Sequence, residues 1–167
     1  MSRSWIKAPR HVVMDTIPLM LLLVGAYDRS YLLKFKRLKS YGYVEEDFEV
    51  LRKFLLSTKS ITVTPGVLAE AANFLENDSY FSEIIVRNMS LLAKLKETYI
   101  EKARILNCEL VFQLAFTDTS LLLLAQNSGG SILTRDRKLW AACKKSGVDV
   151  FHLDQVLWAG DLISQRG

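Results

Sequence analysis

Four acidic residues have the type and spacing expected of ligands for a divalent cation. Asp15 directly follows an apolar, β-branched run, Asp136 closely follows a second such run, and Asp118 begins an expected helix. Glu70 lies within another expected helix and is flanked by alanines. Carboxylates that meet repel one another unless a cation balances them, and ligand sets made only of oxygen suit Mg²⁺ or Mn²⁺. Such a site can activate water for phosphodiester hydrolysis, whereas the alternative is that each acid only stabilises the start of a helix.

The elements that must position these acids are short apolar strands separated by helices. The sequence predicts strands over residues 11–14, 61–64, 131–134 and 148–153. It predicts helices over residues 16–25, 45–55, 67–75, 81–95, 118–126 and 136–145, the fifth of them capped by Thr117. This alternation is typical of a parallel sheet covered on both faces, so the expected fold class is α/β. Ligands of such sheets bind at the carboxyl ends of the strands, where we expect three of the acids.

Length and composition indicate one globular domain over residues 1–167. Half of the residues are hydrophobic and 24% are charged, which excludes a disordered chain. Cys108 and Cys143 are too few for a disulfide scaffold and lack the spacing of a zinc site, so we expect small buried side chains in a reducing, cytoplasmic protein. The apolar run 17–27 has about half the length of a membrane helix. We therefore interpret it as a buried helix and expect no membrane association.

Positive charge is concentrated in the first quarter of the chain. Residues 1–39 contain two acidic residues and eight basic ones, which are Arg3, Lys7, Arg10, Arg29, Lys34, Lys36, Arg37 and Lys39. This imbalance suits a polyanion such as RNA, and the alternative is a solvated basic face. Residues 31–41 mix basic and aromatic residues in a loop or a short helix. Their rings could stack on unpaired bases, or their apolar side chains could pack while the lysines stay in solvent.

Four segments resemble, in the same order, the four acidic motifs of the PIN-domain nucleases. They are residues 12–16 (VVMDT), 64–70 (TPGVLAE), 117–121 (TDTSL) and 132–139 (ILTRDRKL). The resemblance covers about residues 11–157, and it is to bacterial members with an extended segment after the first helix, here the basic stretch at about 27–60. It implies a three-layer α/β/α sandwich with a central, mostly parallel sheet.

The same resemblance implies a metal-dependent endoribonuclease. Its catalytic and metal-binding residues would be Asp15, Glu70, Asp118 and Asp136, its cofactor Mg²⁺ or Mn²⁺, and its substrate single-stranded or structured RNA. Many small proteins of this kind are toxins, so an antitoxin protein and a second copy of the chain are further partners to consider. The chain departs from the family at Ile17, where similar proteins often have Asn. This departure leaves open a catalytically weak PIN-like module that binds RNA or protein.

Five residues near the acids are candidates for positioning the site or for contacting substrate. They are Thr16, Asn73, Thr134, Arg135 and Arg137. The two hydroxyls could orient carboxylates, and the amide falls on the same helix face as Glu70. The two guanidinium groups flank Asp136 and could hold a phosphate. The alternatives are capping, strand propensity and ordinary solvation.

Other polar and aromatic residues are interpreted as structural. His11 and His152 lie in or beside expected strands, and neither has a partner at ligand spacing. Trp140 and Trp158 are assigned to the core or to an interface rather than to base stacking.

Overall fold

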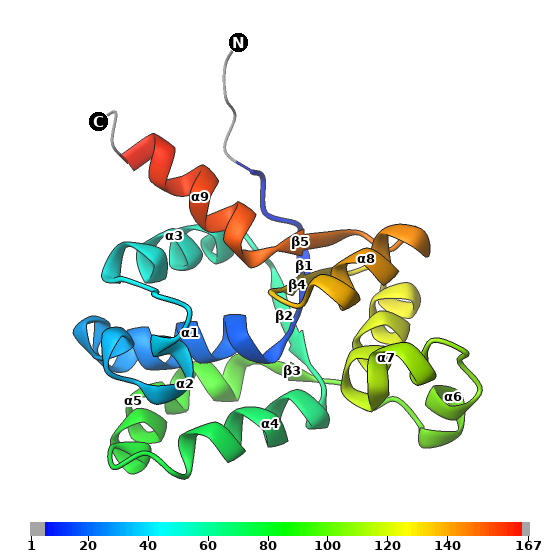
Figure 1. Ribbon diagram of the computed structural model, residues 1–167, viewed down its shortest axis with the longest axis horizontal. Coiled ribbons are helices and arrows are strands. Elements are labelled where there is room, and N and C mark those ends of the chain that lie inside the picture. Colours follow the sequence, from blue (N-terminus) through cyan, green and yellow to red (C-terminus); the bar gives the residue numbers. More distant parts are fainter. Residues whose placement is uncertain (1–5, 165–167) are drawn as a thin grey trace.

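Five parallel strands form the central sheet. The computed structural model describes residues 6–164, with side chains described through residue 160. The strands are β1 (His11–Met14), β2 (Ser60–Val63), β3 (Lys96–Glu97), β4 (Ser131–Thr134) and β5 (Val150–His152). They follow the order β3-β2-β1-β4-β5, and every neighbouring pair is parallel (Figure 1). Within the described residues, the sheet expected to be mostly parallel is wholly so.

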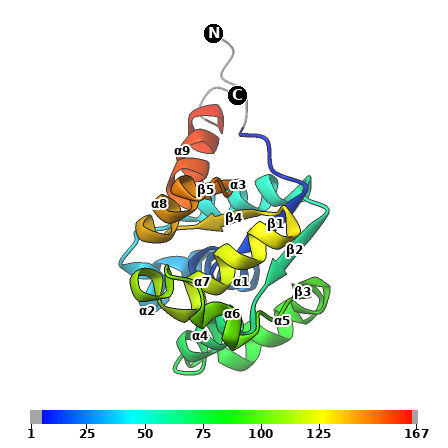
Figure 2. The ribbon, with the colours of Figure 1, turned by 90° about the vertical axis from the view of Figure 1, so that its right-hand side faces the viewer.

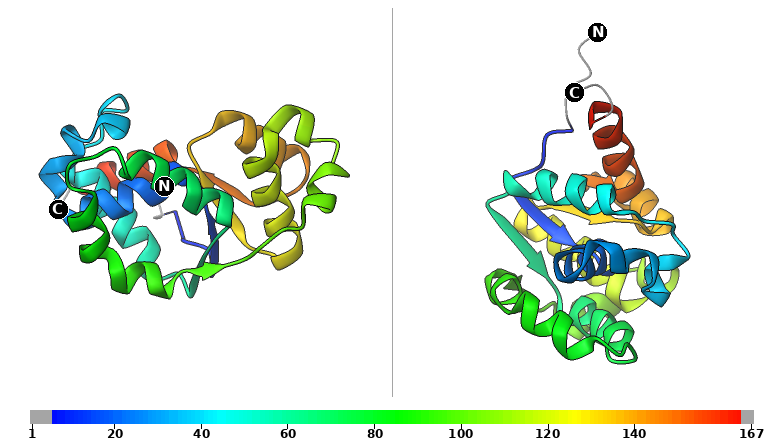
Figure 3. Two further views of the ribbon diagram at one scale, coloured as in Figure 1. Left: turned by 90° about the horizontal axis from the view of Figure 1, so that it is seen from below. Right: turned by 90° about the vertical axis from the view of Figure 1, so that its left-hand side faces the viewer.

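Helices cover both faces of this sheet. They are α1 (Thr16–Tyr27), the 3-10 helix η1 (Arg29–Leu33), α2 (Lys36–Lys39), α3 (Glu45–Leu56), α4 (Pro65–Leu75), α5 (Phe81–Lys94), α6 (Lys102–Leu106), α7 (Val111–Ser128), α8 (Arg137–Lys145) and α9 (Leu153–Ser164). Helices α6 to α8 lie on one face and α1 to α5 on the other (Figures 2 and 3), while α9 packs against α3. The expected α/β/α sandwich is confirmed.

Helix α1 accounts for the long apolar run near the start of the chain. Its residues are buried from Pro18 to Gly25, because α1 contacts α3, α4, α5 and β4. At Gly25 a Cβ atom would lie 2.3 Å from the ring of Phe48 on α3, so this crossing requires glycine. The run is a buried helix as expected, and it continues to Tyr27. Among the helices that the structure describes, none has both the length and the apolar character needed to cross a membrane.

The helix that carries Asp118 begins earlier than predicted. Helix α7 starts at Val111 and is broken at Ala115, whose φ of 62° lies in the left-handed region. The predicted N-cap role of Thr117 is wrong, because Thr117 already lies inside α7. Instead, the hydroxyl of Thr119 donates to the carbonyl oxygen of Ala115 at 2.6 Å. The helical segment that carries Asp118 therefore starts at a backbone break that the sequence does not predict.

Three elements were not predicted: β3, α6 and α9. Strand β3 consists of two exposed polar residues, so it lacks the apolar alternation that marks a strand. Helix α6 has only five residues. Helix α9 begins at Leu153, directly after β5, so the strand predicted over 148–153 is too long at both ends.

Residues 31–41 form parts of the short helices η1 and α2. The side chains of Leu32, Phe35 and Leu38 are buried, while the lysines of this segment are exposed. The apolar side chains thus pack as one of the two interpretations predicted, and RNA contact by the exposed cations stays a prediction. Arg3, counted in the basic quarter, lies outside the described residues.

Two expectations about burial need correction. Trp158, expected in the core or at an interface, is 65% exposed and so lies outside the core, while the interface stays a prediction. Trp140 is half-buried against the core. Cys143 is buried as expected, but Cys108 is only half-buried.

Candidate functional site

The carboxyl ends of β1 and β4 lie side by side where the strand order reverses. The chain proceeds from β1 to β2 and β3 on one side of this point, and from β4 to β5 on the other. Ligands of open α/β sheets bind at such a point. Asp15 follows β1, and its backbone N–H donates to the carbonyl oxygen of Leu133 on β4 at 3.1 Å. Asp136 lies just beyond β4 and caps α8 by accepting the N–H of Leu139 at 2.9 Å.

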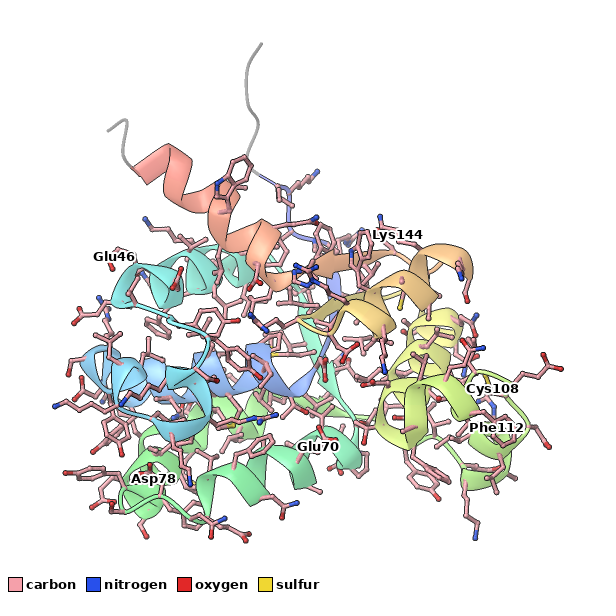
Figure 4. All side chains as sticks on the ribbon, in the orientation of Figure 1. Glu46, Glu70, Asp78, Cys108, Phe112 and Lys144 are labelled. Atoms are coloured by element: carbon pink, nitrogen blue, oxygen red, sulfur yellow. The ribbon has the colours of Figure 1, made fainter. Side chains whose placement is uncertain are left out.

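All four candidate acids line one pocket of about 540 Å³, called here the four-acid pocket. Asp15 and Asp136 come from the sheet edge, Glu70 from α4 and Asp118 from α7, so both helical layers contribute. Figure 4 shows Glu70 on the side of α4 that faces the interior of the molecule. Asp15 is 7% exposed. The structure therefore brings together the four acids that the sequence singled out.

Two threonine hydroxyls connect the acids. Thr134 Oγ1 donates to Asp15 Oδ2 at 2.5 Å and accepts the backbone N–H of Asp136 at 2.9 Å. Thr16 donates its backbone N–H to Asp15 Oδ1 at 2.7 Å and its hydroxyl to Glu70 Oε2 at 2.6 Å. Both threonines were predicted to orient carboxylates, and these hydrogen bonds give each of them such a position.

The hydrogen bond from Thr134 to Asp15 predicts a measurable effect on cation binding. We expect Thr134→Val to weaken Mn²⁺ binding by about 10- to 100-fold, because the ligand loses the donor that orients it. Isothermal titration of Mn²⁺ into the purified protein measures this. Thr62→Val, a matched change on β2 away from the pocket, should leave the affinity unchanged. Equal Mn²⁺ affinity in the wild type and Thr134→Val would contradict the positioning role.

Burial and mutual repulsion raise the pKa values of two of the acids. Burial raises the pKa of Asp15, hydrogen bonds from the two threonines lower it in part, and the charges of Glu70 and Asp136 raise it further. Burial and the charges of the other three acids raise the pKa of Asp118 to about 7. Among the described residues, no Lys, Arg or His forms an ion pair with any of the four. The four acids therefore repel one another without an ion-pair partner among the described residues.

The raised pKa of Asp118 predicts how the stability of the metal-free protein varies with pH. The folded protein holds this proton more tightly than the unfolded chain, so the free energy of unfolding should fall as pH rises from about 4 to about 7. Asp118→Asn removes this ionisation. We expect the variant to exceed the wild type by about 1 kcal/mol, or about 3 °C in Tm, at about pH 8, and to gain nothing at about pH 4.

Thermal unfolding in EDTA at about pH 4 and about pH 8 measures the difference in stability between Asp118→Asn and the wild type. Glu46→Gln removes an exposed acid on α3, far from the pocket (Figure 4), and should not reproduce the gain at high pH. A wild type that becomes more stable between about pH 4 and about pH 7, with Asp118→Asn following it, would contradict the predicted repulsion.

The acids line the pocket without forming a complete coordination group. In the described part of the chain, no three Asp, Glu, His or Cys side chains are arranged to hold a metal ion. Glu70 and Asp136 each direct one carboxylate oxygen at a protein donor. A cation shared by three acids would therefore require side-chain rotation. The Asp118 carboxylate accepts no hydrogen bond from the residues described, so no hydrogen bond opposes its rotation.

Basic and aromatic side chains form the rim of the four-acid pocket. Arg135 Nε lies 3.4 Å from Asp154 Oδ1, and its guanidinium lies 4.0 Å from the ring centroid of Tyr41. The charge of Arg135 is thus shared with an acid, which weakens its predicted role in holding a phosphate. The guanidinium of Arg37, from α2, lies 4.5 Å from the ring centroid of Phe74 on α4 and also lines the pocket.

The remaining candidates divide into one that lines the pocket and one that does not. Arg137 lines the pocket, is exposed and forms no ion pair within the described residues. Asn73 is exposed on α4 and is not part of the pocket wall, so the structure gives it no contact with the four acids. Ile17, at the position where the resemblance departs, is part of the wall.

His152 lines the pocket, although the sequence interpretation had assigned it only a structural role. It is 8% exposed, and its Nδ1 accepts the backbone N–H of Asp154 at 3.3 Å. The rule that pointed to Asp15, proximity to the carboxyl end of a strand, applies equally to His152 because it ends β5. His11 instead begins β1, and its Nδ1 lies 2.7 Å from Ser60 Oγ.

Comparison with known proteins does not identify the chain. No protein-family model matches it, and a search of curated proteins finds no relative.

Proposed function

We propose that this protein is an endoribonuclease that uses Mg²⁺ or Mn²⁺ to hydrolyse phosphodiester bonds in single-stranded or structured RNA. The observation that carries the proposal is the convergence of Asp15, Glu70, Asp118 and Asp136 on one pocket at the carboxyl edge of a parallel sheet. The resemblance of the four acidic segments to those of PIN-domain nucleases points in the same direction. The proposed setting is cytoplasmic.

The chemistry of the pocket fits a hard divalent cation. All four acids offer oxygen, the donor that Mg²⁺ and Mn²⁺ prefer. Burial and repulsion within the group raise the pKa values of Asp15 and Asp118, and a cation would relieve the repulsion. Asp15 keeps acceptor capacity because each of its oxygens receives one hydrogen bond and a carboxylate oxygen can accept two. Rotation of Asp118 would complete the group, since catalytic contacts often tighten only in the loaded enzyme.

The residues of the pocket have distinct roles in the proposed hydrolysis. When bound, Mg²⁺ or Mn²⁺ stabilises charge on the phosphate and lowers the pKa of water. Asp15, Asp118 and Asp136 would hold the cation. Glu70, fixed through Oε2 by Thr16, keeps Oε1 to accept a proton from the attacking water. The water oxygen bonds to phosphorus as the P–O bond opposite breaks, and the departing oxygen takes a proton from solvent.

Arg37 and Arg137 are the side chains best placed to draw a phosphate toward this negative pocket. We expect Arg37→Gln to weaken RNA binding by about 3-fold and to lower the salt slope by about one phosphate contact. Fluorescence anisotropy over a range of KCl concentrations measures both. Arg104→Gln, a change on α6 outside the pocket, is the matched control. An unchanged salt slope in Arg37→Gln would favour the alternative, in which the basic segment is a solvated surface.

A cleavage assay tests the proposed function directly. Wild type and Asp118→Asn are incubated with end-labelled single-stranded RNA and structured RNA, in Mg²⁺, Mn²⁺ or EDTA. We expect cleavage by the wild type in Mg²⁺ or Mn²⁺ only. Equal cleavage by both proteins would point to a contaminating nuclease and overturn the proposal, as would a lack of cleavage under every condition.

An exposed apolar surface favours a second candidate function, protein binding with weak catalysis. Phe112 on α7 is 89% exposed (Figure 4). Phe116 on the same helix is 53% exposed, and Leu106 on the neighbouring α6 is 51% exposed. Apolar surfaces of this kind often bind proteins. An antitoxin or a second copy of the chain would fit it. Inactivity on RNA together with a stable protein complex would favour this candidate.

A further inference from the structure

A second pocket of about 460 Å³ adjoins the four-acid pocket and is called here the aromatic pocket. Residues of α8, β5 and α9 line it. Helices α8 and α9 follow the neighbouring strands β4 and β5 and lie close to each other (Figure 2). Its own wall includes Trp140 and Trp158, and it shares three residues with the four-acid pocket: Arg137, His152 and Asp154. A ligand that extends along this shared wall can therefore occupy both pockets.

The wall of the aromatic pocket contains buried N–H groups that have no hydrogen-bond partner among the described residues. His152 is only 8% exposed, and its Nε2 is buried without a partner. Because Nδ1 accepts the N–H of Asp154, the neutral ring carries its proton on Nε2 and can donate it there. The indole Nε1 of Trp140 is a second buried donor without a partner. Both atoms have almost no accessible surface, and unpaired donors are costly, so a ligand with hydrogen-bond acceptors would gain from this wall where either ring turns toward the pocket.

The aromatic side chains supply a flat apolar surface beside these donors. Trp158 is 65% exposed at the pocket, although water is a poor environment for an indole ring. Nucleobases combine a flat face that stacks on aromatic rings with edges that carry hydrogen-bond acceptors. Arg137, on the wall shared with the four-acid pocket, offers a positive charge for the adjoining phosphate.

We propose that the aromatic pocket binds an unpaired nucleobase next to the phosphate that occupies the four-acid pocket. The base stacks on Trp158, and a turn of the His152 ring toward the pocket would let its Nε2 donate a hydrogen bond to the base. This inference rests on the proposed function for its choice of RNA as ligand. It deepens that function, because a base held in double-stranded RNA cannot enter the pocket. The enzyme would therefore require a locally unpaired nucleotide at the cleavage position.

Binding measured without cleavage tests the inference. The probe is a fluorescein-labelled single-stranded oligoribonucleotide, compared with a set that carries one abasic residue at each position in turn. Anisotropy is recorded in EDTA for the wild type, Trp158→Ala, Trp158→Phe and the control Phe112→Ala. Phe112 is an exposed aromatic residue at the far end of the molecule (Figure 4). Because Trp158 is largely exposed, its substitution should leave the fold intact, which thermal unfolding verifies.

We expect Trp158→Ala to weaken binding of intact RNA by about 5- to 100-fold, and Trp158→Phe to restore most of the loss. One abasic position should weaken binding to the wild type but cause no further loss in Trp158→Ala, since ring and base act as one contact. Equal affinity in Trp158→Ala and Phe112→Ala would overturn the inference. The inference would also be overturned if Trp158→Ala weakened the binding of every abasic probe equally, or if it weakened only the binding of a protein partner.

The two proposals fail in distinguishable ways. If the wild type cleaves RNA but Trp158→Ala has the same Kd and KM, only the aromatic pocket proposal fails. If no cation supports cleavage but Trp158→Ala still loses base-dependent binding, the nuclease proposal fails and the base-binding pocket remains.

Discussion

We expect Asp15→Asn to lower kcat for RNA cleavage by about 10³-fold or more, while the Tm in EDTA stays level or rises. Asn is nearly isosteric with Asp and can still accept the N–H of Thr16, so the site keeps its shape. The substitution removes the charge that a cation needs. It also removes the charge whose burial, together with repulsion from Glu70 and Asp136, raises the pKa of Asp15 in the wild type. Loss of activity without loss of stability is the signature of a functional acid rather than a structural one.

The chain offers a matched control for Asp15. Asp149 Oδ2 accepts the hydroxyl of Ser131 on β4 at 2.5 Å, as Asp15 accepts that of Thr134. Ser131 begins β4 and Thr134 ends it, so Asp149 lies at the opposite edge of the sheet. We expect Asp149→Asn to leave kcat unchanged. A comparable loss of kcat in both variants would show that the effect comes from damage to β4 rather than from the pocket.

The sequence could predict those parts of the site that depend on local pattern. The runs before Asp15 and Asp136 are apolar and β-branched, so β1 and β4 match the predicted strands at both ends. Since parallel strands end at one edge, their acids had to lie near one another. Asp118 was expected at this edge by the same rule, but the end of a strand is not what places it there, because it lies inside α7 after a break at Ala115. How close Asp118 comes to the other three acids depends on how α7 packs, and the spacing of residues in the sequence does not predict that packing.

The rim of the pocket was beyond local prediction because its contacts join distant segments. Arg37 on α2 lies over Phe74 on α4, and Arg135 after β4 lies over Tyr41 after α2. No periodicity relates such pairs. His152 is different, because its position at the end of β5 was a usable signal. The sequence interpretation assigns His152 a structural role because it has no partner at ligand spacing, although the partners of a pocket residue come from other strands.

A saturating divalent cation should stabilise the protein strongly, and more so at high pH. At about 100 times its Kd, a ligand that binds only the folded state adds about 2.7 kcal/mol, which corresponds to a rise in Tm of about 5–10 °C for a chain of this length. The pKa of Asp118 is raised to about 7, so a cation must displace a proton at about pH 5 but meets an ionised carboxylate at about pH 8. We expect the larger shift at about pH 8.

Differential scanning fluorimetry with Mn²⁺, Mg²⁺ or K⁺ at matched ionic strength measures these shifts. In Asp118→Asn the cation-induced shift should shrink at about pH 8 and lose much of its pH dependence, because one displaced proton and one carboxylate ligand are gone while the raised pKa of Asp15 remains. This variant is expected to be the more stable protein in EDTA and the less stable one in Mn²⁺. That reversal separates cation binding from general screening, because screening would raise the Tm of the wild type equally with K⁺ and would never reverse the order of the two proteins.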